Sequence, residues 1–342
     1  MHYTPYLNAM RHSSPFLRTT HFTPPSLVRF GELLAIVLGF LPGCSDDDDT
    51  AADPAGPDKI TVPQAGLHPE GIQYDAANQH FFVSSRTQGR IGTVKDDSTY
   101  TQFADDARLV STIGLNLDAS RNRLLVAVSD NGANTSRSTP ATLRQLAALA
   151  IYNTTNGTLS NFVNLGTLKA GSHFANDIAV DSQGNAYITD SLSPIIYQVN
   201  PQGIASIFLE NTQLSGSTGF GLNGIVFHPD GYLLVAKSND GALFKVPLSN
   251  PTGFTRVTTS QNLTGADGML LQDNRTLLVV SGSQSTVFRI SSSDGWVNAS
   301  SSGSFATGAV SPTTITRRGT DAYVLYPYQA TSPRFAIVKA KF

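Results

Sequence analysis

A short pattern that recurs along the chain constrains the fold more than any other feature of the sequence. Three segments align by eye: residues 176–189 (NDIAVDSQGNAYIT), 223–236 (NGIVFHPDGYLLVA) and 267–280 (DGMLLQDNRTLLVV). Each begins with a polar residue, continues as a short apolar run, turns at Asp, Asn or Gly, and ends in a second apolar run. Two short apolar runs around such a turn predict a β-hairpin, so the repeat indicates one hairpin per unit.

Three further segments fit the same template less closely. They are residues 70–84 (EGIQYDAANQHFFVS), 113–127 (IGLNLDASRNRLLVA) and 312–325 (PTTITRRGTDAYVL). The six equivalent first positions are Glu70, Ile113, Asn176, Asn223, Asp267 and Pro312, and successive positions lie 43, 63, 47, 44 and 45 residues apart. A period of roughly 40–50 residues is typical of four-stranded propeller blades. We therefore predict an all-β fold, a six-bladed β-propeller of four-stranded blades over residues 58–342.

The one long interval and the chain ends complete this prediction. Residues 129–148 are a polar stretch leading into TLRQLAALA, which we interpret as an insertion in the second blade, with a short helix possible only over 142–148. The last predicted strand, residues 335–339, has no later partner in its blade. We expect residues 60–62 to pair with it and close the ring, because propellers protect strand edges by radial closure.

Charge and cysteine content exclude several classes of function. Lys and Arg total 23 against 25 Asp and Glu, a net charge of −2, and no basic stripe is present, so we expect no nucleic-acid partner. The single cysteine excludes an internal disulfide and a thiolate cluster for zinc or iron–sulfur.

The N-terminal region reads as an export signal and a tether. Residues 33–40 (LLAIVLGF) are too short to span a bilayer but have the length of a signal-peptide core, and the sequence LPGC follows, ending at Cys44. This resembles a bacterial lipobox. We expect residues 1–43 to be a lipoprotein-type signal peptide with a start codon open to reassignment, Cys44 to be lipidated, and residues 44–57 to be an acidic, proline-containing linker. The domain would then be exported and membrane-anchored in the cell envelope, on the outer membrane or the periplasmic face. The alternative is an ordinary cleaved signal and a secreted protein, in a bacterial or a eukaryotic host.

Equivalent repeat positions of a propeller converge near its axis, and four of the six first positions carry oxygen. Glu70 and Asp267 offer carboxylates, and Asn176 and Asn223 offer amide carbonyls. These hard ligands suit Ca²⁺, with another divalent cation as the alternative, and the absence of His and Cys argues against zinc and copper. The competing interpretation is that Asn and Asp only form turns. Glu70 does not fit it, because Glu is a poor turn residue and a costly one near an axis without a cation.

The segments PEGIQYD, FANDIAVDSQGNAYITD, LNGIVFHPDG and ADGMLL resemble the senescence-marker-protein/gluconolactonase (regucalcin-like) family, relatives of paraoxonase and diisopropylfluorophosphatase. The resemblance covers roughly residues 60–342. It implies that Glu70, Asn176, Asn223 and Asp267 bind a catalytic divalent cation. The chain departs from the family in its first blade, where residues 72–74 are IQY rather than an early aromatic. No substrate-contacting arginine can be assigned in the second blade.

The expected function is a calcium-dependent hydrolase of a lactone or related ester, with the metal as Lewis acid and Asp267 as base or nucleophile. Its small-molecule substrate would enter at the propeller mouth. Asp177 would support the metal site from behind or cap its own turn, and His173 would shuttle protons at the mouth or sit on an exposed loop. One alternative is a non-catalytic binding module with a structural calcium. Another is a strictosidine-synthase-like propeller, against which the complete quartet counts. Neither substrate nor oligomeric state follows from the sequence.

Overall fold

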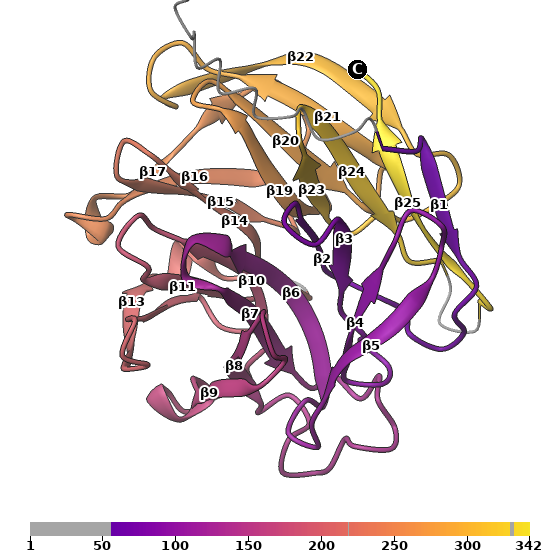
Figure 1. Cartoon of the computed structure of the whole chain (residues 1–342). Coiled ribbons are helices and arrows are strands. Elements are labelled where there is room, and N and C mark those ends of the chain that lie inside the picture. Colours follow the sequence, from indigo (N-terminus) through magenta and orange to yellow (C-terminus); the bar gives the residue numbers. More distant parts are fainter. Residues whose placement is uncertain (1–55, 218, 329–331) are drawn as a thin grey trace, which may run out of the picture. The chain divides into compact units, whose positions relative to one another are not determined.

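The computed structural model describes residues 56–217, 219–328 and 332–342, which form six β-sheets around one axis (Figure 1). The predicted signal peptide, Cys44 and nearly all of the predicted linker lie outside the described residues. The six-bladed β-propeller predicted from the repeat is confirmed. Figure 1 shows the first strand of each blade lying close to the centre of the ring, and each of these inner strands contacts the next.

In each of the first five blades the strands follow one another outward in chain order, antiparallel to their neighbours. The first three blades comprise β2 (Ile72–Asp75), β3 (His80–Val83), β4 (Arg90–Val94) and β5 (Tyr100–Asp105); β6 (Ser111–Asp118), β7 (Arg123–Ser129), β8 (Ala147–Asn153) and β9 (Leu159–Asn164); and β10 (Ala175–Val180), β11 (Ala186–Asp190), β12 (Ile195–Val199) and β13 (Ala205–Glu210).

The fourth and fifth blades comprise β14 (Leu222–His228), β15 (Tyr232–Lys237), β16 (Ala242–Pro247) and β17 (Thr255–Arg256); and β19 (Ala266–Asp273), β20 (Thr276–Ser281), β21 (Thr286–Ser291) and β22 (Asn298–Ala306). A short strand, β18 (Thr258–Thr259), adds to the fifth sheet in parallel with β22.

The sixth blade joins the two ends of the domain. It contains β23 (Ile315–Arg318), β24 (Asp321–Tyr326), β25 (Phe335–Ala340) and, as its outermost strand, β1 (Lys59–Val62). β1 pairs antiparallel with β25, with Lys59 opposite Val338 and Val62 opposite Phe335. The predicted closure of the ring is confirmed.

The hydrophobic core is divided among the gaps between blades. Each of six clusters of buried apolar side chains draws on two neighbouring blades. Between the sixth and first blades, for example, Phe81 meets Tyr323 with ring centroids 5.4 Å apart, and Ile60 packs into the same cluster. Since each sheet buries both faces in this way, the blades stabilise one another around the ring.

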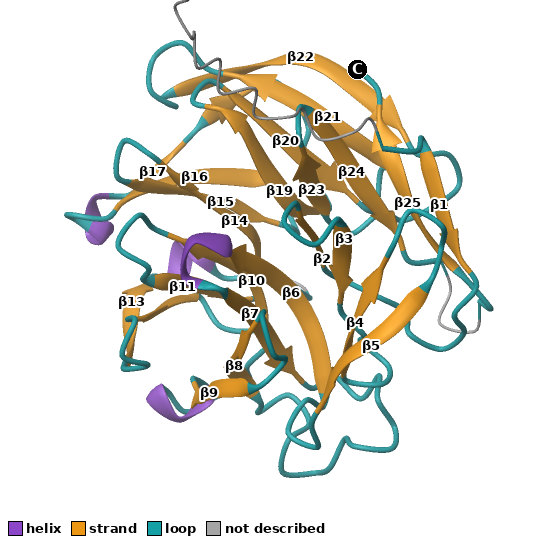
Figure 2. Ribbon diagram, in the orientation of Figure 1, coloured by secondary structure: helices purple, strands orange, loops and turns teal. Residues whose placement is uncertain are grey.

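The predicted insertion connects β7 to β8, but the short helix over 142–148 is wrong. Ala147 already belongs to β8, where it pairs with Ser129. Burial of this alanine-rich strand between two blades overrides the helix propensity of Ala and Leu. Helical structure in the described part of the chain is limited to four single 3₁₀ turns (Figure 2), at Ala119–Arg121, Gly166–Leu168, Thr212–Leu214 and Pro251–Gly253.

Candidate functional site

The inner strands are β2, β6, β10, β14, β19 and β23. We call the end of the axis where they begin the front end, and the end where they finish the back end. At the front end, blades two to five share one irregularity: the pairing of the first two strands shifts between Thr112 and Leu115, Ala175 and Ile178, Leu222 and Ile225, and Ala266 and Met269. Such bulges re-aim side chains and are common beside functional sites. Three of the predicted site residues, Asn176, Asn223 and Asp267, lie within these shifts.

The inner strands approach one another closely at the front end. A Cβ atom on Gly224 would lie 2.1 Å from the Asp267 carbonyl oxygen, so only glycine fits there. Gly224 thus lies against the carbonyl group of the first position of the next blade. The corresponding glycine of the fifth blade, Gly268, donates its backbone N–H to the Thr313 carbonyl at 2.8 Å. Thr313 is therefore the sixth equivalent position.

The prediction that Pro312 occupies the sixth position is wrong by one residue, for a local reason. The hairpin of the sixth blade closes with two residues between the paired Arg318 and Asp321. The hairpin of the fourth blade uses three residues between His228 and Tyr232. An alignment that treats the two turns as equal slips by one position.

Glu70 lies immediately before β2 and is held by its backbone. The Ser84 hydroxyl accepts hydrogen bonds from the backbone N–H groups of Glu70, at 3.1 Å, and Gly71, at 2.8 Å. Burial raises the pKa of the Glu70 carboxyl, and Arg86 opposes this rise with its Nη1 atom 3.9 Å from Oε2. The side chain of Glu70 is 18% exposed, which fits a group enclosed by protein that still reaches solvent at the front end.

Asp267 faces Glu70 across the axis from the fifth blade. Burial raises the pKa of Asp267 well above its usual range, and the negative charges of Glu70 and Asp177 raise it further. Asn223, within hydrogen-bonding reach of the carboxylate, and Arg86 oppose the rise. Asp267 therefore lies within range of the charges of two other carboxyl groups and one arginine.

The two asparagines are buried and oriented differently. The Asn176 Nδ2 atom donates to the Ser191 hydroxyl at 2.8 Å, which leaves its carbonyl oxygen free of that contact. The Asn223 Oδ1 atom is buried without a hydrogen-bond partner among the described residues, and so is Glu70 Oε2. A buried oxygen without a partner is costly, so these atoms point to a ligand that the protein itself does not supply.

Asp177 lies behind the four predicted ligands. Its Oδ1 atom accepts from its own neighbour, the Ile178 N–H, at 2.9 Å, and its Oδ2 atom accepts from the Ile225 N–H of the next blade at 3.4 Å. Burial nevertheless raises the pKa of Asp177 to about 7. Of the two predicted roles, the contacts across blades match a supporting residue more closely than a simple turn cap.

His173 is neither at the mouth nor on an exposed loop, since it is only 1% exposed within the third blade. Its Nδ1 lies 2.7 Å from Asp190 Oδ2 and its Nε2 lies 2.7 Å from the Lys169 carbonyl oxygen. Both neighbouring oxygens can accept an N–H from the ring, and the hydrogen bond to Asp190 raises the pKa of His173. The Tyr197 hydroxyl also donates to Asp190, at 2.8 Å.

A recurrent serine escaped the sequence analysis. Ser191 follows β11, accepts from Asn176 and donates to the Leu222 carbonyl. Ser84 follows β3 in the same way and fixes the Glu70 loop. A serine at or just after the second apolar run of a repeat was therefore a readable signal for groups that hold the site.

The donor set at the front end consists of two carboxylates and two amides. No cluster of three or more His, Cys, Asp and Glu side chains suited to a metal occurs in residues 56–342 as far as they are described. A cation site here would depend on amide oxygens, which Ca²⁺ accepts readily. In the same part of the chain, no helix is long and apolar enough to cross a membrane.

Comparison with known proteins agrees with the fold. Among solved structures, the Malassezia sympodialis allergen Mala s 1 is 20% identical, with a TM-score of 0.68 over 84% of this chain and 97% of that one. A gluconolactonase from Xanthomonas campestris is 18% identical, with a TM-score of 0.57 over 83% and 89%. A luciferin-regenerating enzyme is 13% identical, with a TM-score of 0.56 over 84% and 98%. A search of curated protein sequences found no match.

Identity at this level shows the shared fold and no more. The sequence model of one family, described as the SMP-30/Gluconolactonase/LRE-like region, matches residues 68–326, which span all six inner strands and the four predicted ligands. The chain therefore belongs to the SMP-30/gluconolactonase/LRE-like family.

Proposed function

We propose that the protein is a calcium-dependent hydrolase of a lactone or related ester, with its reaction centre at the front end of the axis. Family membership supports a lactonase-type hydrolase as the general class of activity. The observation that carries the proposal is the pair of buried oxygens without partners, Glu70 Oε2 and Asn223 Oδ1, beside the crowded carboxylate of Asp267.

Glu70, Asn176, Asn223 and Asp267 would hold the cation, and their hard oxygen atoms favour Ca²⁺ over softer metals. When bound, a divalent cation would keep the two carboxylates ionised and polarise the carbonyl oxygen of the substrate.

The chain's own residues then supply positioning and proton transfer. Asp267 would take a proton from the attacking water and return it to the alcohol that leaves as the ester bond breaks. Ser191 orients the Asn176 amide through its 2.8 Å hydrogen bond. Arg86 keeps a third of its side chain exposed beside Glu70, where it can attract a negatively charged group of the substrate or product.

The test is a hydrolysis screen with γ- and δ-lactones, including gluconolactone, and p-nitrophenyl acetate, in calcium and after chelation. We expect lactone turnover that depends on calcium and is lost in Asp267→Ala. Turnover that persists in the chelated protein would contradict the metal assignment, and an inactive but calcium-binding protein would contradict the hydrolase.

A second candidate is a binding module in which calcium is structural. It is favoured by the hydrogen bonds that cross from the third blade to the fourth at this point, from Thr189 Oγ1 to the Asn223 carbonyl at 2.6 Å and from Ser191 to the Leu222 carbonyl. A cation at a junction between blades would brace the ring. Calcium-dependent stability without turnover in the same screen identifies this case.

We further propose, on sequence evidence, that the domain is exported and anchored to the envelope membrane through a lipid on Cys44. Cys44→Ser should release the protein from the membrane fraction or block processing of the signal. Unchanged membrane fractionation of that variant in a bacterial host would contradict the anchor.

A further inference from the structure

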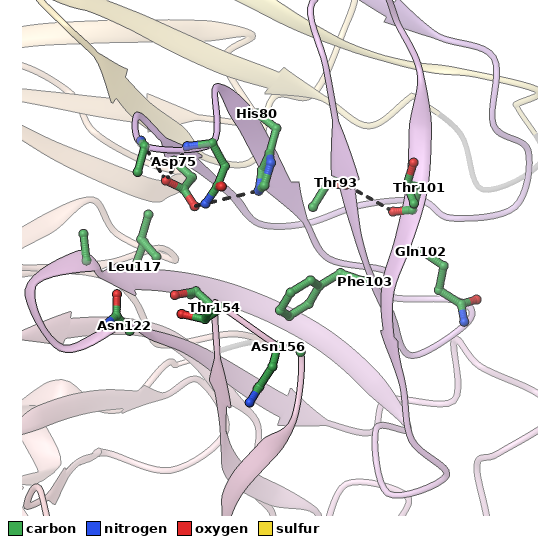
Figure 3. A pocket seen from close by; sticks show the side chains of 15 residues that line it. Asp75, His80, Thr93, Thr101, Gln102, Phe103, Leu117, Asn122, Thr154 and Asn156 are labelled. Atoms are coloured by element: carbon green, nitrogen blue, oxygen red, sulfur yellow. Dashed lines mark hydrogen bonds and ion pairs between the residues drawn. The ribbon is translucent and has the colours of Figure 1, made fainter.

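A cavity lies at the back end, away from the four predicted ligands. It occupies about 520 Å³ between the first and second blades (Figure 3). Its walls are the turn between β2 and β3, the outer strands β4 and β5, and the turns of the second blade near residues 119–122 and 154–157. Glu70 precedes β2, whereas the cavity begins at Asp75 at the other end of that strand. The volume suits a small ligand.

The titratable side chains in the described lining of the cavity are Asp75 and His80. Asp75 is committed to its own turn: Oδ1 accepts from the Ala77 N–H at 3.0 Å and Oδ2 from the Asn78 Nδ2 at 2.8 Å. His80 lies beside it with Nε2 at 3.9 Å from Asp75 Oδ2, too far for a hydrogen bond, and this nitrogen is buried without a hydrogen-bond partner among the described residues. Burial lowers the pKa of His80, which favours the uncharged ring. No Lys or Arg is among the described residues of the lining. A neutral ligand is therefore favoured.

Several polar side chains of the lining have hydrogen-bonding capacity to spare. The amide of Asn122 and the hydroxyls of Thr101 and Thr154 make no side-chain hydrogen bond within the described part of the chain. Each of these groups can both donate and accept. Hydroxyl groups of a ligand have the same dual character, so the lining matches a molecule that carries several hydroxyls.

One aromatic ring forms an apolar wall among these groups. Figure 3 shows Phe103 between the polar side chains of the two blades. Its edge contacts hold it in place, with centroids 5.0 Å from Phe82 and 6.3 Å from Tyr152, while part of the side chain stays accessible. A fixed aromatic face offers an apolar surface to the C–H groups on one side of a sugar ring.

We propose that this cavity binds a neutral pyranose sugar, with a C–H face against Phe103 and hydroxyls on Asn122, Thr101 and Thr154. The site is separate from the proposed reaction centre and does not need the cation.

The test is titration of the full protein with methyl β-glucopyranoside and with cellobiose, followed by calorimetry and saturation-transfer NMR. We expect saturable binding that chelation leaves unchanged. Phe103→Ala should weaken it about tenfold, and Thr154→Val about fivefold, the loss of one neutral hydrogen bond. Gln102→Ala, an exposed glutamine of β5 whose side chain lies on the face away from the cavity, is the control and should change nothing. Since Phe103 also packs in the blade, circular dichroism melting accompanies each variant, and Thr154→Val is the test that keeps the size of the side chain.

Three results would overturn the proposal. They are no saturation at 50 mM sugar, binding that Thr154→Val and Phe103→Ala leave intact but Asp267→Ala removes, and tighter binding of glucuronate than of the neutral glucoside. The second would move the sugar to the front end. Lactone hydrolysis can fail or succeed independently of all three.

Discussion

The front and back ends of the axis differ in chemistry although the same six strands form both. At the front, Glu70 and Asn223 interact with Asp267. The Glu70 Oε2 and Asn223 Oδ1 atoms are buried there without a hydrogen-bond partner among the described residues. At the back, a cavity of about 620 Å³ is lined by all six inner strands, largely with apolar side chains such as Phe227 and Leu271. Four blades share a shifted register only at the front. The comparison teaches that a repeated bulge lets an apolar strand present polar groups at one end without disturbing its packing at the other.

Asp177 marks the boundary between the two ends. It lines the back cavity, yet its charge also raises the pKa of Asp267 at the front. If the reaction centre lies at the front end, substitutions there should alter hydrolysis and calcium binding, whereas matched substitutions at the back end should not.

The largest expected effect is on turnover. Asp267→Asn keeps an oxygen for a cation but removes the base, so we expect lactone hydrolysis to fall by about 10²–10⁴-fold with the fold retained. Asp273→Asn makes the same change at the exposed back end of the same strand and should alter the rate less than twofold. Equal losses in the two variants would break the comparison. Steady-state kinetics and circular dichroism supply the measurement.

The next effect is on thermal stability. Calcium at 100 times its Kd should add about 2.7 kcal/mol to the free energy of unfolding by mass action, which raises Tm by about 4–5 °C for a domain of this size. Glu70→Gln should remove most of this gain, because it withdraws one of the two ionic ligands. Scanning fluorimetry with calcium and with chelator checks it, and Phe227→Ala at the back end serves as the control whose calcium response should stay intact.

A smaller effect is expected on cation affinity. Ser191→Ala frees the Asn176 amide to rotate, so calcium should bind about fivefold more weakly, as for one lost neutral hydrogen bond. Ser191→Thr keeps the hydroxyl and should restore most of the affinity. A calcium titration followed by calorimetry measures Kd for both variants. An unaltered Kd in Ser191→Ala would show that the hydrogen bond from the Asn176 amide to Ser191 does not contribute to calcium binding.

The smallest effect is a pH dependence of the free energy of unfolding, caused by the buried His173. The pKa of His173 is raised in the folded protein by Asp190, so its stabilising contribution is complete below about pH 6.5, its ordinary pKa, and is lost as pH rises through the folded value. Asp190 and the Tyr197 hydroxyl face the ring, and Lys169 contributes its carbonyl while its Nζ pairs with Glu210 at 2.8 Å.

His173→Gln should therefore lie furthest below the native protein at pH 6 and approach it as the pH rises to 9. Urea unfolding at four pH values in this range gives the measurement. A difference that stays constant with pH would mean that His173 acts only by packing.

Local patterns in the sequence predicted the blades and the ring closure because each hairpin carries its own apolar runs and turn. They misplaced the start of β8 because Ala147 is a strand residue only through its pairing with Ser129. They shifted the sixth position to Pro312 because turn length is not visible in the repeat.

The candidate site was predictable only in part. The four oxygen-bearing residues share one register and could be read from it. The serines that hold the site, such as Ser191, follow the second apolar run and could also be read. The burial of His173 and the cavity between the first and second blades depend on contacts between parts of the chain that the repeat does not encode.

The β1–β25 pair has a consequence for when the protein can fold. Residues 59–62 find their partners only at residues 335–338, which are made after every other strand of the ring. Until then one edge of the sixth sheet is bare, and a bare strand edge invites pairing with other chains. So long a loop closure makes the final step slow compared with forming a hairpin. A chain without β25 would leave β1 unpaired and the ring open, so this one strand holds the first and last strands of the propeller together.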